Sequence, residues 1–240
     1  MKFYYDFHLH SCLSPCGDND MTPYNLVNMA KILGLDIIAL TDHNTCQNCA
    51  AAMEVGKNIG ITVVPGMELC TSEEVHVVCL FPELKSAESF SEYVLSTVPK
   101  INNRPQIFGD QLIMDSGDGI IGTQELLLTT ASGISIERAV ETVEQYGGVC
   151  YPAHIDRSSY SVLSNLGMIT SEMNFSAVEM TDSADQAEYR KKHPIISDCP
   201  IIVSSDAHYL ENMKEANHSI ELTSGSPEAV TDYFKKLIKI

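Results

Sequence analysis

The chain has 240 residues, of which 44 % are hydrophobic and 20 % charged, so it has the composition of a globular protein with a sizeable core and not of a disordered chain. Its net charge of −17 repels a nucleic-acid backbone, and we therefore expect no duplex nucleic acid as partner, whereas a small anionic substrate is not excluded because bound divalent cations invert the local field. No apolar run reaches the roughly 18 residues of a membrane span and no signal peptide is evident, so we expect a cytoplasmic protein with no membrane partner.

Apolar, β-branched runs alternate with helical patterns along the whole chain. Strands are predicted at 3–9, 36–40, 62–65, 75–80, 148–151, 177–180, 200–203 and 218–222. Helices are predicted at 25–33, 50–59, 86–98, 135–146, 183–192 and 226–238. The alternation favours a parallel α/β sheet, and short repeated strands suit a closed barrel of one domain over residues 1–240. Residues 99–134 lack this pattern and fit a lid or insertion over the site.

Two histidines, His8 and His10, end the first predicted strand. Side chains at positions i and i+2 of a strand point to the same face, so these two imidazoles converge on one place. Asp206 and His208 repeat the spacing after the run 200–203. Two such pairs at strand ends predict a metal site assembled from distant parts of the chain.

Further ligand-type residues follow other predicted strands, namely His43, Glu68 and His154, and His76 lies at the start of the predicted strand 75–80. Asp42, next to His43, is expected to orient an imidazole by hydrogen bonding. Glu68 has two carboxylate oxygens and can bridge two cations. The mixture of imidazole and carboxylate ligands suits two or three divalent ions of zinc, manganese or iron.

Arg157 stands three residues after His154 and is a candidate clamp for phosphoryl oxygens, with a surface ion pair as the alternative. Between two metal ions, a bridging water becomes hydroxide near neutral pH and can attack phosphorus. His43 and His208 are also candidates for a general acid or for stabilising charge in this reaction.

With these residues in place, the chain resembles the PHP (polymerase and histidinol phosphatase) superfamily. The matching motifs are Phe7-His8-Leu9-His10-Ser11, Thr41-Asp42-His43-Asn44, Pro65-Gly66-Met67-Glu68, Glu74-Val75-His76-Val77, Pro152-Ala153-His154 and Ser205-Asp206-Ala207-His208. The resemblance implies a distorted (β/α)7 TIM-like barrel with three metal ions at the strand ends. It implies that His8, His10, Glu68 and Asp206 bind one ion, that Glu68, His76 and His154 bind the second, and that His43 and His208 bind the third.

The remaining ligand of the third ion is expected shortly after the first motif, where the chain departs from the common Ser-Asp-Gly pattern of the family. Asp18 is our choice because a carboxylate suits a catalytic cation, and Cys16 and Asp20 stay open. Cys46 and Cys49 have C-x-x-C spacing, for which a redox or structural zinc role competes with a plain helix start.

The resemblance also implies phosphoester hydrolysis. We expect a metal-dependent phosphoesterase that acts on a small phosphomonoester of the nucleotide or histidinol-phosphate type. A metal-dependent amidohydrolase and a non-catalytic metal-binding module are the alternatives. The oligomeric state is not predicted.

Overall fold

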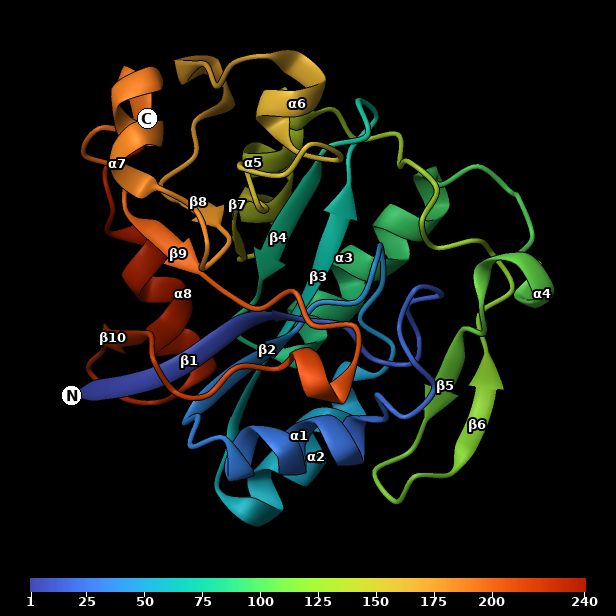
Figure 1. Ribbon diagram of the computed structural model, residues 1–240. Helices are drawn as coiled ribbons and strands as arrows, with labels where there is room; N and C mark the ends of the chain where they lie inside the picture. The colour runs from blue at the N-terminus through green and yellow to red at the C-terminus, as the bar shows by residue number, and fades with distance from the viewer.

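A curled six-stranded sheet forms the centre of the structure, a computed structural model that describes residues 1–240 (Figure 1). The strand order is β10-β1-β2-β3-β4-β7. The bounds are β1 Lys2–Leu9, β2 Ile37–Leu40, β3 Thr62–Cys70, β4 His76–Leu80, β7 Val149–Pro152 and β10 Ser219–Glu221. A separate parallel pair, β8 (Val178–Met180) and β9 (Ile201–Val203), continues the curl beside β7 and β1 (Figure 1).

Helices cover the outer side of the sheet and one end of it (Figure 1). The α-helices are α1 Pro23–Ile32, α2 Cys49–Ile59, α3 Leu84–Thr97, α4 Pro105–Phe108, α5 Ile136–Gln145, α6 Val162–Leu166, α7 Gln186–Lys192 and α8 Pro227–Lys235. Short 3-10 turns lie at Ser171–Met173, Pro194–Ile196 and Leu210–Asn212. None of these helices combines the length and the apolar character required to cross a membrane.

The α/β class is confirmed, and each strand and helix predicted outside residues 99–134 is present within a few positions. The prediction of an entirely parallel sheet was wrong, because β4 runs antiparallel to both β3 and β7. The residues that join β3 to β4, Thr71 to Val75, are too few for the crossover that parallel neighbours need. The strand ladders also do not close into a ring of seven, since β9 reaches β1 only through the bridge of Leu9 with Ala207.

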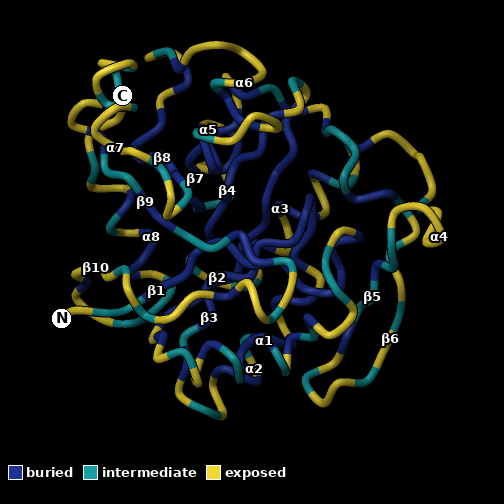
Figure 2. The backbone as a smooth tube through the Cα atoms, in the orientation of Figure 1, coloured by how far each residue is buried: buried dark blue, intermediate teal, exposed yellow.

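The inner face of the curled sheet carries its own apolar cluster, which includes Phe7, Val64, Val78 and Tyr151. Phe234 of α8 closes this cluster from one end, with its ring centroid 5.2 Å from that of Tyr151 and 6.3 Å from that of Phe7. A larger cluster lies between the sheet and the outer helices. Strands β2, β3, β4 and β7 are therefore buried on both faces (Figure 2), which explains their nearly continuous apolar sequences.

Residues 99–134 contain α4 and an antiparallel hairpin of β5 (Leu112–Met114) and β6 (Ile120–Thr123), at the edge of the molecule (Figure 1). This hairpin packs against the loop 11–20 that follows β1. The Leu112 N–H donates to the Cys12 carbonyl oxygen at 2.9 Å, and Asn19 donates to the Asp110 carboxylate at 3.0 Å. The segment thus supports the loop that leaves the strand of His8 and His10.

Candidate metal centre

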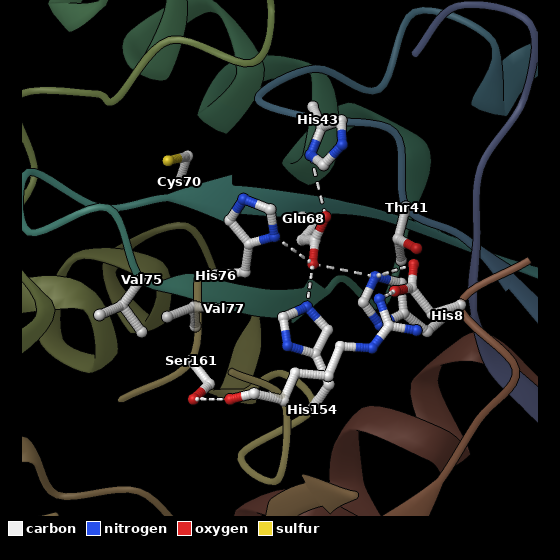
Figure 3. A network of polar contacts seen from close by, with 12 residues as sticks. His8, Thr41, His43, Glu68, Cys70, Val75, His76, Val77, His154 and Ser161 are labelled. Carbon is white, nitrogen blue, oxygen red and sulfur yellow. Dashed lines mark hydrogen bonds and ion pairs between the residues drawn. The ribbon is translucent and has the colours of Figure 1, made fainter. Parts of the chain in front are cut away.

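Glu68 lies at the centre of a group of histidines. Its carboxylate oxygens are 2.8 Å from His76 Nδ1, 2.9 Å from His43 Nδ1, 3.1 Å from His8 Nε2 and 3.2 Å from His154 Nε2. Figure 3 shows these four rings arranged around the carboxylate, each from a different part of the chain. Glu68 is 1 % exposed, so its charge needs compensation from these partners or from a cation.

The strands bring these groups together in a way that follows from their pattern. Glu68 shares a face of β3 with Val64, and His76 shares a face of β4 with Val78, so both polar groups sit above the inner apolar cluster. The pairing of β1 with β2 shifts register between Asp6 and Leu9. Such a bulge changes the direction of side chains, and here it lets His8 reach the same face as Phe7.

His8, His10 and Asp206 form the second part of the centre. The Nε2 atoms of the two histidines are 3.2 Å apart, and Asp206 Oδ1 lies 3.3 Å from the first and 3.1 Å from the second. Asp206 has a left-handed φ of 49°, and His154 one of 28°. Positive φ values at non-glycine residues are uncommon and cluster at functional sites, which fits a backbone held in place by the site.

Three imidazoles form a further cluster, from His10, His43 and His208. The His10 ring centroid is 4.6 Å from that of His43 and 4.1 Å from that of His208. The thiol sulfur of Cys16 lies 3.2 Å from His43 Nε2. Burial alone would raise the pKa of this thiol, but His43, with His208 and His10, lowers it to about 5.

Asp18 does not join this cluster. Its carboxylate accepts the N–H of Asp20 at 2.8 Å, and only its backbone reaches the site, through an N–H donated to the His208 carbonyl oxygen at 2.9 Å. Asp20 is exposed. Of the three residues considered for the third position, the structure brings Cys16 alone into contact with its imidazoles.

The hydrogen bonds on the outer nitrogens fix how the imidazoles face the centre. His8 donates from Nδ1 to Glu179 at 2.9 Å, and His208 donates from Nδ1 to the Asp206 carbonyl oxygen at 2.9 Å. His10 Nδ1 is 3.0 Å from Ser14 Oγ, whose hydroxyl donates to Asp42 at 2.7 Å. Each ring therefore directs the Nε2 lone pair inward, as a metal-ligating histidine does.

The donor set fits divalent cations. The Nε2 atoms of His8 and His10 face one another, so either a proton or a cation must lie between them. His43 Nδ1 and Glu68 Oε2 are close but not aligned for a hydrogen bond, and both are buried without a hydrogen-bond partner, as is Asp206 Oδ1. Such atoms are rare in folded proteins and mark a missing ion or water. Three groups of ligand atoms lie close enough to hold an ion: His8-His10-Glu68, His43-Glu68-His76 and His10-His43-His208.

The charges in the centre depend on each other. Burial opposes ionisation of Glu68, yet His76, His8 and His43 hold its pKa well below the ordinary value. Burial likewise opposes protonation of His8, but Glu179, Asp206 and Glu68 raise its pKa well above the ordinary value. At His76, burial lowers the pKa more than the Glu68 carboxylate raises it, so the pKa falls to about 4. Protons thus compensate the carboxylates wherever cations do not.

Glu179, on β8, is a functional residue that the sequence interpretation missed. Besides accepting from His8, it accepts the backbone N–H of His154 at 3.1 Å, and it is 1 % exposed. The signal was a charged residue between the apolar residues of a short buried strand, Val178 and Met180. Asp42 does not bond directly to an imidazole as expected, but accepts from Ser14, whose hydroxyl oxygen lies 3.0 Å from His10 Nδ1.

Arg157 and a small cavity complete the site. Arg157 Nη1 lies 2.6 Å from Asp206 Oδ2, with the side chain 42 % exposed. The cavity has a volume of about 110 Å³ and is lined by His43, Glu68, His76, His154, Arg157, Ser159, Tyr160, Asp206 and His208. Residues 154–160 form its rim, whereas no residue of 99–134 lines it. The Cys46–Cys49 pair lies apart in the outer core, with free thiols and outside the three ligand groups.

The chain is similar to proteins that cleave phosphoesters. A family model described as the PHP domain matches residues 6–239. A 5'-3' exoribonuclease of Haemophilus influenzae is 35 % identical over 79 residues, which are 32 % of this chain and 28 % of that protein. The 5'-3' exoribonuclease Rnm of Escherichia coli is 29 % identical over 113 residues, 45 % of this chain and 37 % of that protein. The chain spans less than half the length of the curated relatives it matches.

Among solved structures, the lesion-specific endonuclease Q of Pyrococcus furiosus has a TM-score of 0.72 at 17 % identity, covering 98 % of this chain and 56 % of that one. Endonuclease Q in complex with a 27-mer duplex carrying an abasic lesion gives 0.71. The expectation that excluded duplex nucleic acid was therefore wrong. A net charge summed over the chain does not set the field at the site, where bound cations together with Arg157 would reverse its sign.

Proposed function

The chain belongs to the PHP family of metal-dependent hydrolases, which act on phosphoester bonds, and we propose that it hydrolyses a phosphoester at the end of a nucleic-acid strand. The observation that carries this proposal is the position of Glu68, which contacts four imidazoles and lines a small cavity together with Arg157. The similarity to exoribonucleases supports the choice of substrate.

The residues around Glu68 would hold two or three divalent ions. When bound, these ions would supply the positive charge that activates water and neutralises the phosphoryl oxygens. His8, His10, Glu68 and Asp206 would hold the first, His76 and His154 with Glu68 the second, and His43 and His208 the third. The lone pairs at His8 Nε2 and His10 Nε2 suit this role, and the Nδ1 bond of His208 favours a ligand over a general acid there.

Arg157 would bind the phosphoryl group. A guanidinium offers paired N–H donors that match phosphate oxygens, and its exposed side chain can turn from Asp206 toward the cavity. A cavity of about 110 Å³ holds a phosphoryl group but no nucleobase. The rest of the substrate must therefore lie outside, beside Ser159 and Tyr160. Tyr160 is 44 % exposed and its ring is stacked 4.6 Å from that of His76.

The same narrow cavity favours a second candidate, a free phosphomonoester such as a nucleotide or histidinol phosphate, because it admits a phosphoryl group from either kind of molecule. The two candidates differ in the product released. A monoesterase frees inorganic phosphate from a mononucleotide, whereas a strand-end hydrolase frees a mononucleotide from an oligonucleotide.

A substrate panel with purified, metal-supplemented protein tests the proposal. It contains a 5'-phosphorylated single-stranded oligoribonucleotide, the same strand without the phosphate, a duplex with an abasic site, a mononucleotide and a simple amide. We expect mononucleotides from the strands, and chelation should stop their release. Phosphate from the mononucleotide alone would favour the second candidate. Amine release without any phosphoester cleavage would favour an amidohydrolase and contradict both.

A further inference from the structure

The loop after β1 places a thiol at the third group of imidazoles. Cys16 Sγ is 3.2 Å from His43 Nε2, and Cys16 is the one exposed cysteine of the eight. A tight turn makes this approach: the Ser14 N–H donates to the Ser11 carbonyl oxygen at 3.0 Å, and the Gly17 N–H donates to that of Ser14 at 2.8 Å. A Cβ at Gly17 would lie 2.6 Å from the Ser11 oxygen, so only glycine permits the turn.

The segment 99–134 holds this turn from the other side. Gly109 has φ of 99°, and a Cβ there would lie 2.0 Å from the Pro15 carbonyl oxygen. Its close approach, together with the bond between Asn19 and Asp110, fixes the backbone on both sides of Cys16. The thiol is therefore positioned by the fold and is not a mobile side chain on an open loop.

The imidazoles it faces form a ligand group that contains no anionic residue. His10, His43 and His208 place their nitrogens within 4.8 Å of one another, and His43 is 4 % exposed. The carboxylate of Asp18, in the same loop, accepts the backbone N–H of Asp20 and does not contact these imidazoles. Around a tetrahedral ion with bonds of about 2.3 Å to sulfur and about 2.0 Å to nitrogen, sulfur and nitrogen lie roughly 3.5 Å apart. The observed contact of 3.2 Å is close to that spacing.

We propose that Cys16 is a thiolate ligand of the third ion, together with His43 and His208, and that this ligand makes the third position selective for zinc, iron or cobalt over manganese and magnesium. The inference rests on the proposed metal-dependent function and adds the identity of one ligand to it. Thiolate is a soft ligand that the harder cations bind poorly, whereas the carboxylates around Glu68 accept both kinds. The same geometry would suit a simple thiol hydrogen bond to His43, so the test must detect a metal–sulfur bond.

Titration of the metal-free full chain with Co²⁺ provides that test, because a thiolate bound to Co²⁺ adds charge-transfer absorption in the near ultraviolet. We expect the wild type to show this absorption with one equivalent of Co²⁺. Cys16→Ser should lose both the absorption and that equivalent, and Cys16→Asp should lose the absorption but keep the equivalent. Cys12→Ala, whose sulfur faces the Leu112 carbonyl, and Asp18→Asn are matched controls that should keep both.

Absorption that persists in Cys16→Ser, or that disappears in Asp18→Asn, would overturn the inference. A measurement without variants guards against misfolding: iodoacetamide should label Cys16 in the metal-free protein and not in the zinc-loaded protein, and equal labelling would also overturn it. These readouts do not need turnover. If the protein hydrolyses phosphoesters but shows no sulfur-to-cobalt absorption, only the inference about Cys16 is contradicted. If it shows the absorption but hydrolyses no phosphoester, only the proposed function is contradicted.

Discussion

Glu179 joins two histidines of the metal centre, since its carboxylate accepts from His8 Nδ1 at 2.9 Å and from the His154 N–H at 3.1 Å. The first bond fixes the tautomer of one imidazole and the second fixes the backbone of another ligand. A carboxylate behind a metal-binding imidazole orients the ring and makes it more basic. Glu179 is therefore a positioning residue for the centre and does not need to touch a substrate.

Substitution of this carboxylate tests that role. We expect Glu179→Gln to weaken zinc binding by about 10-fold to 100-fold, because the amide retains the shape but loses the charge behind His8. Competition with a chromophoric chelator measures the affinity. Glu172→Gln, at an exposed carboxylate near α6, is the matched control and should bind like the wild type. Unchanged affinity in Glu179→Gln would show that the hydrogen bonds serve the fold alone.

Arg157 should matter for turnover more than for metal content. We expect Arg157→Ala to lower kcat/KM by about 10-fold to 100-fold, the value of one or two hydrogen bonds to a charged group. Arg157→Lys should recover little of the lost kcat/KM, because an ammonium group lacks the paired N–H donors of a guanidinium. Metal analysis should show the wild-type content, and Arg138→Ala on the exposed side of α5 is the control. If Arg157→Ala instead lost bound metal together with activity, the ion pair between Arg157 and Asp206 would serve to hold the metal centre in place.

The metal-free centre should exchange protons for cations. Burial lowers the pKa of His8, but Glu179, Asp206 and Glu68 raise it well above the ordinary value, so this imidazole is protonated at neutral pH when no ion is bound. Burial opposes protonation of His43 as well, and Cys16 and Glu68 raise its pKa well above the ordinary value. Metal affinity should therefore rise with pH. Titration calorimetry in buffers of different ionisation heat should show proton release, and identical heats in all buffers would contradict it.

Asp6 provides a pH test beside the ligands, since its carboxylate accepts the backbone N–H groups of His8 and Ser205. Burial raises its pKa to about 6, although Ser205 and His8 donate hydrogen bonds to it. Because the pKa of this carboxyl group is raised in the folded state, the stability of the fold falls as the pH rises from the pKa of an unfolded aspartate, about 4, to about 6. Above the folded-state pKa the loss of stability levels off. At pH 7, Asp6→Asn should then unfold at a higher temperature than the wild type, and its free energy of unfolding should be larger by up to about 3 kcal/mol. At pH 4 the two proteins should differ little. A variant that is less stable at both pH values would contradict this assignment.

The sequence contains most of the metal centre because its ligands lie at strand ends in recognisable pairs. His8 with His10, and Asp206 with His208, were predicted from their spacing alone, and the fold brings the first pair to Glu68 and the second pair to the first. The strand directions were harder to predict, since β3 continues to Cys70, past Gly66, where its apolar run was taken to end. With β3 extended, the remaining connection to β4 is a short turn, and an antiparallel pair follows.

Two features depend on the folded backbone and could not be predicted from the residue types alone. Asp18 was chosen for its chemistry, yet the turn closed by Gly17 directs Cys16 toward His43, while the Asp18 carboxylate accepts the backbone N–H of Asp20. Residues 99–134 showed no helix or strand periodicity, and their hairpin is held by hydrogen bonds to the loop 11–20 that connect residues about 100 positions apart, as between Cys12 and Leu112.

The central claim is that Glu68 joins bound metal ions in a centre that hydrolyses phosphoesters. The most direct measurement determines metal content and oligoribonucleotide hydrolysis on the same preparation of Glu68→Gln, with circular dichroism to show that the variant is folded. We expect a folded protein that holds fewer ions than the wild type, with kcat/KM reduced by at least about 100-fold. A folded Glu68→Gln variant that retains the wild-type rate would contradict the claim.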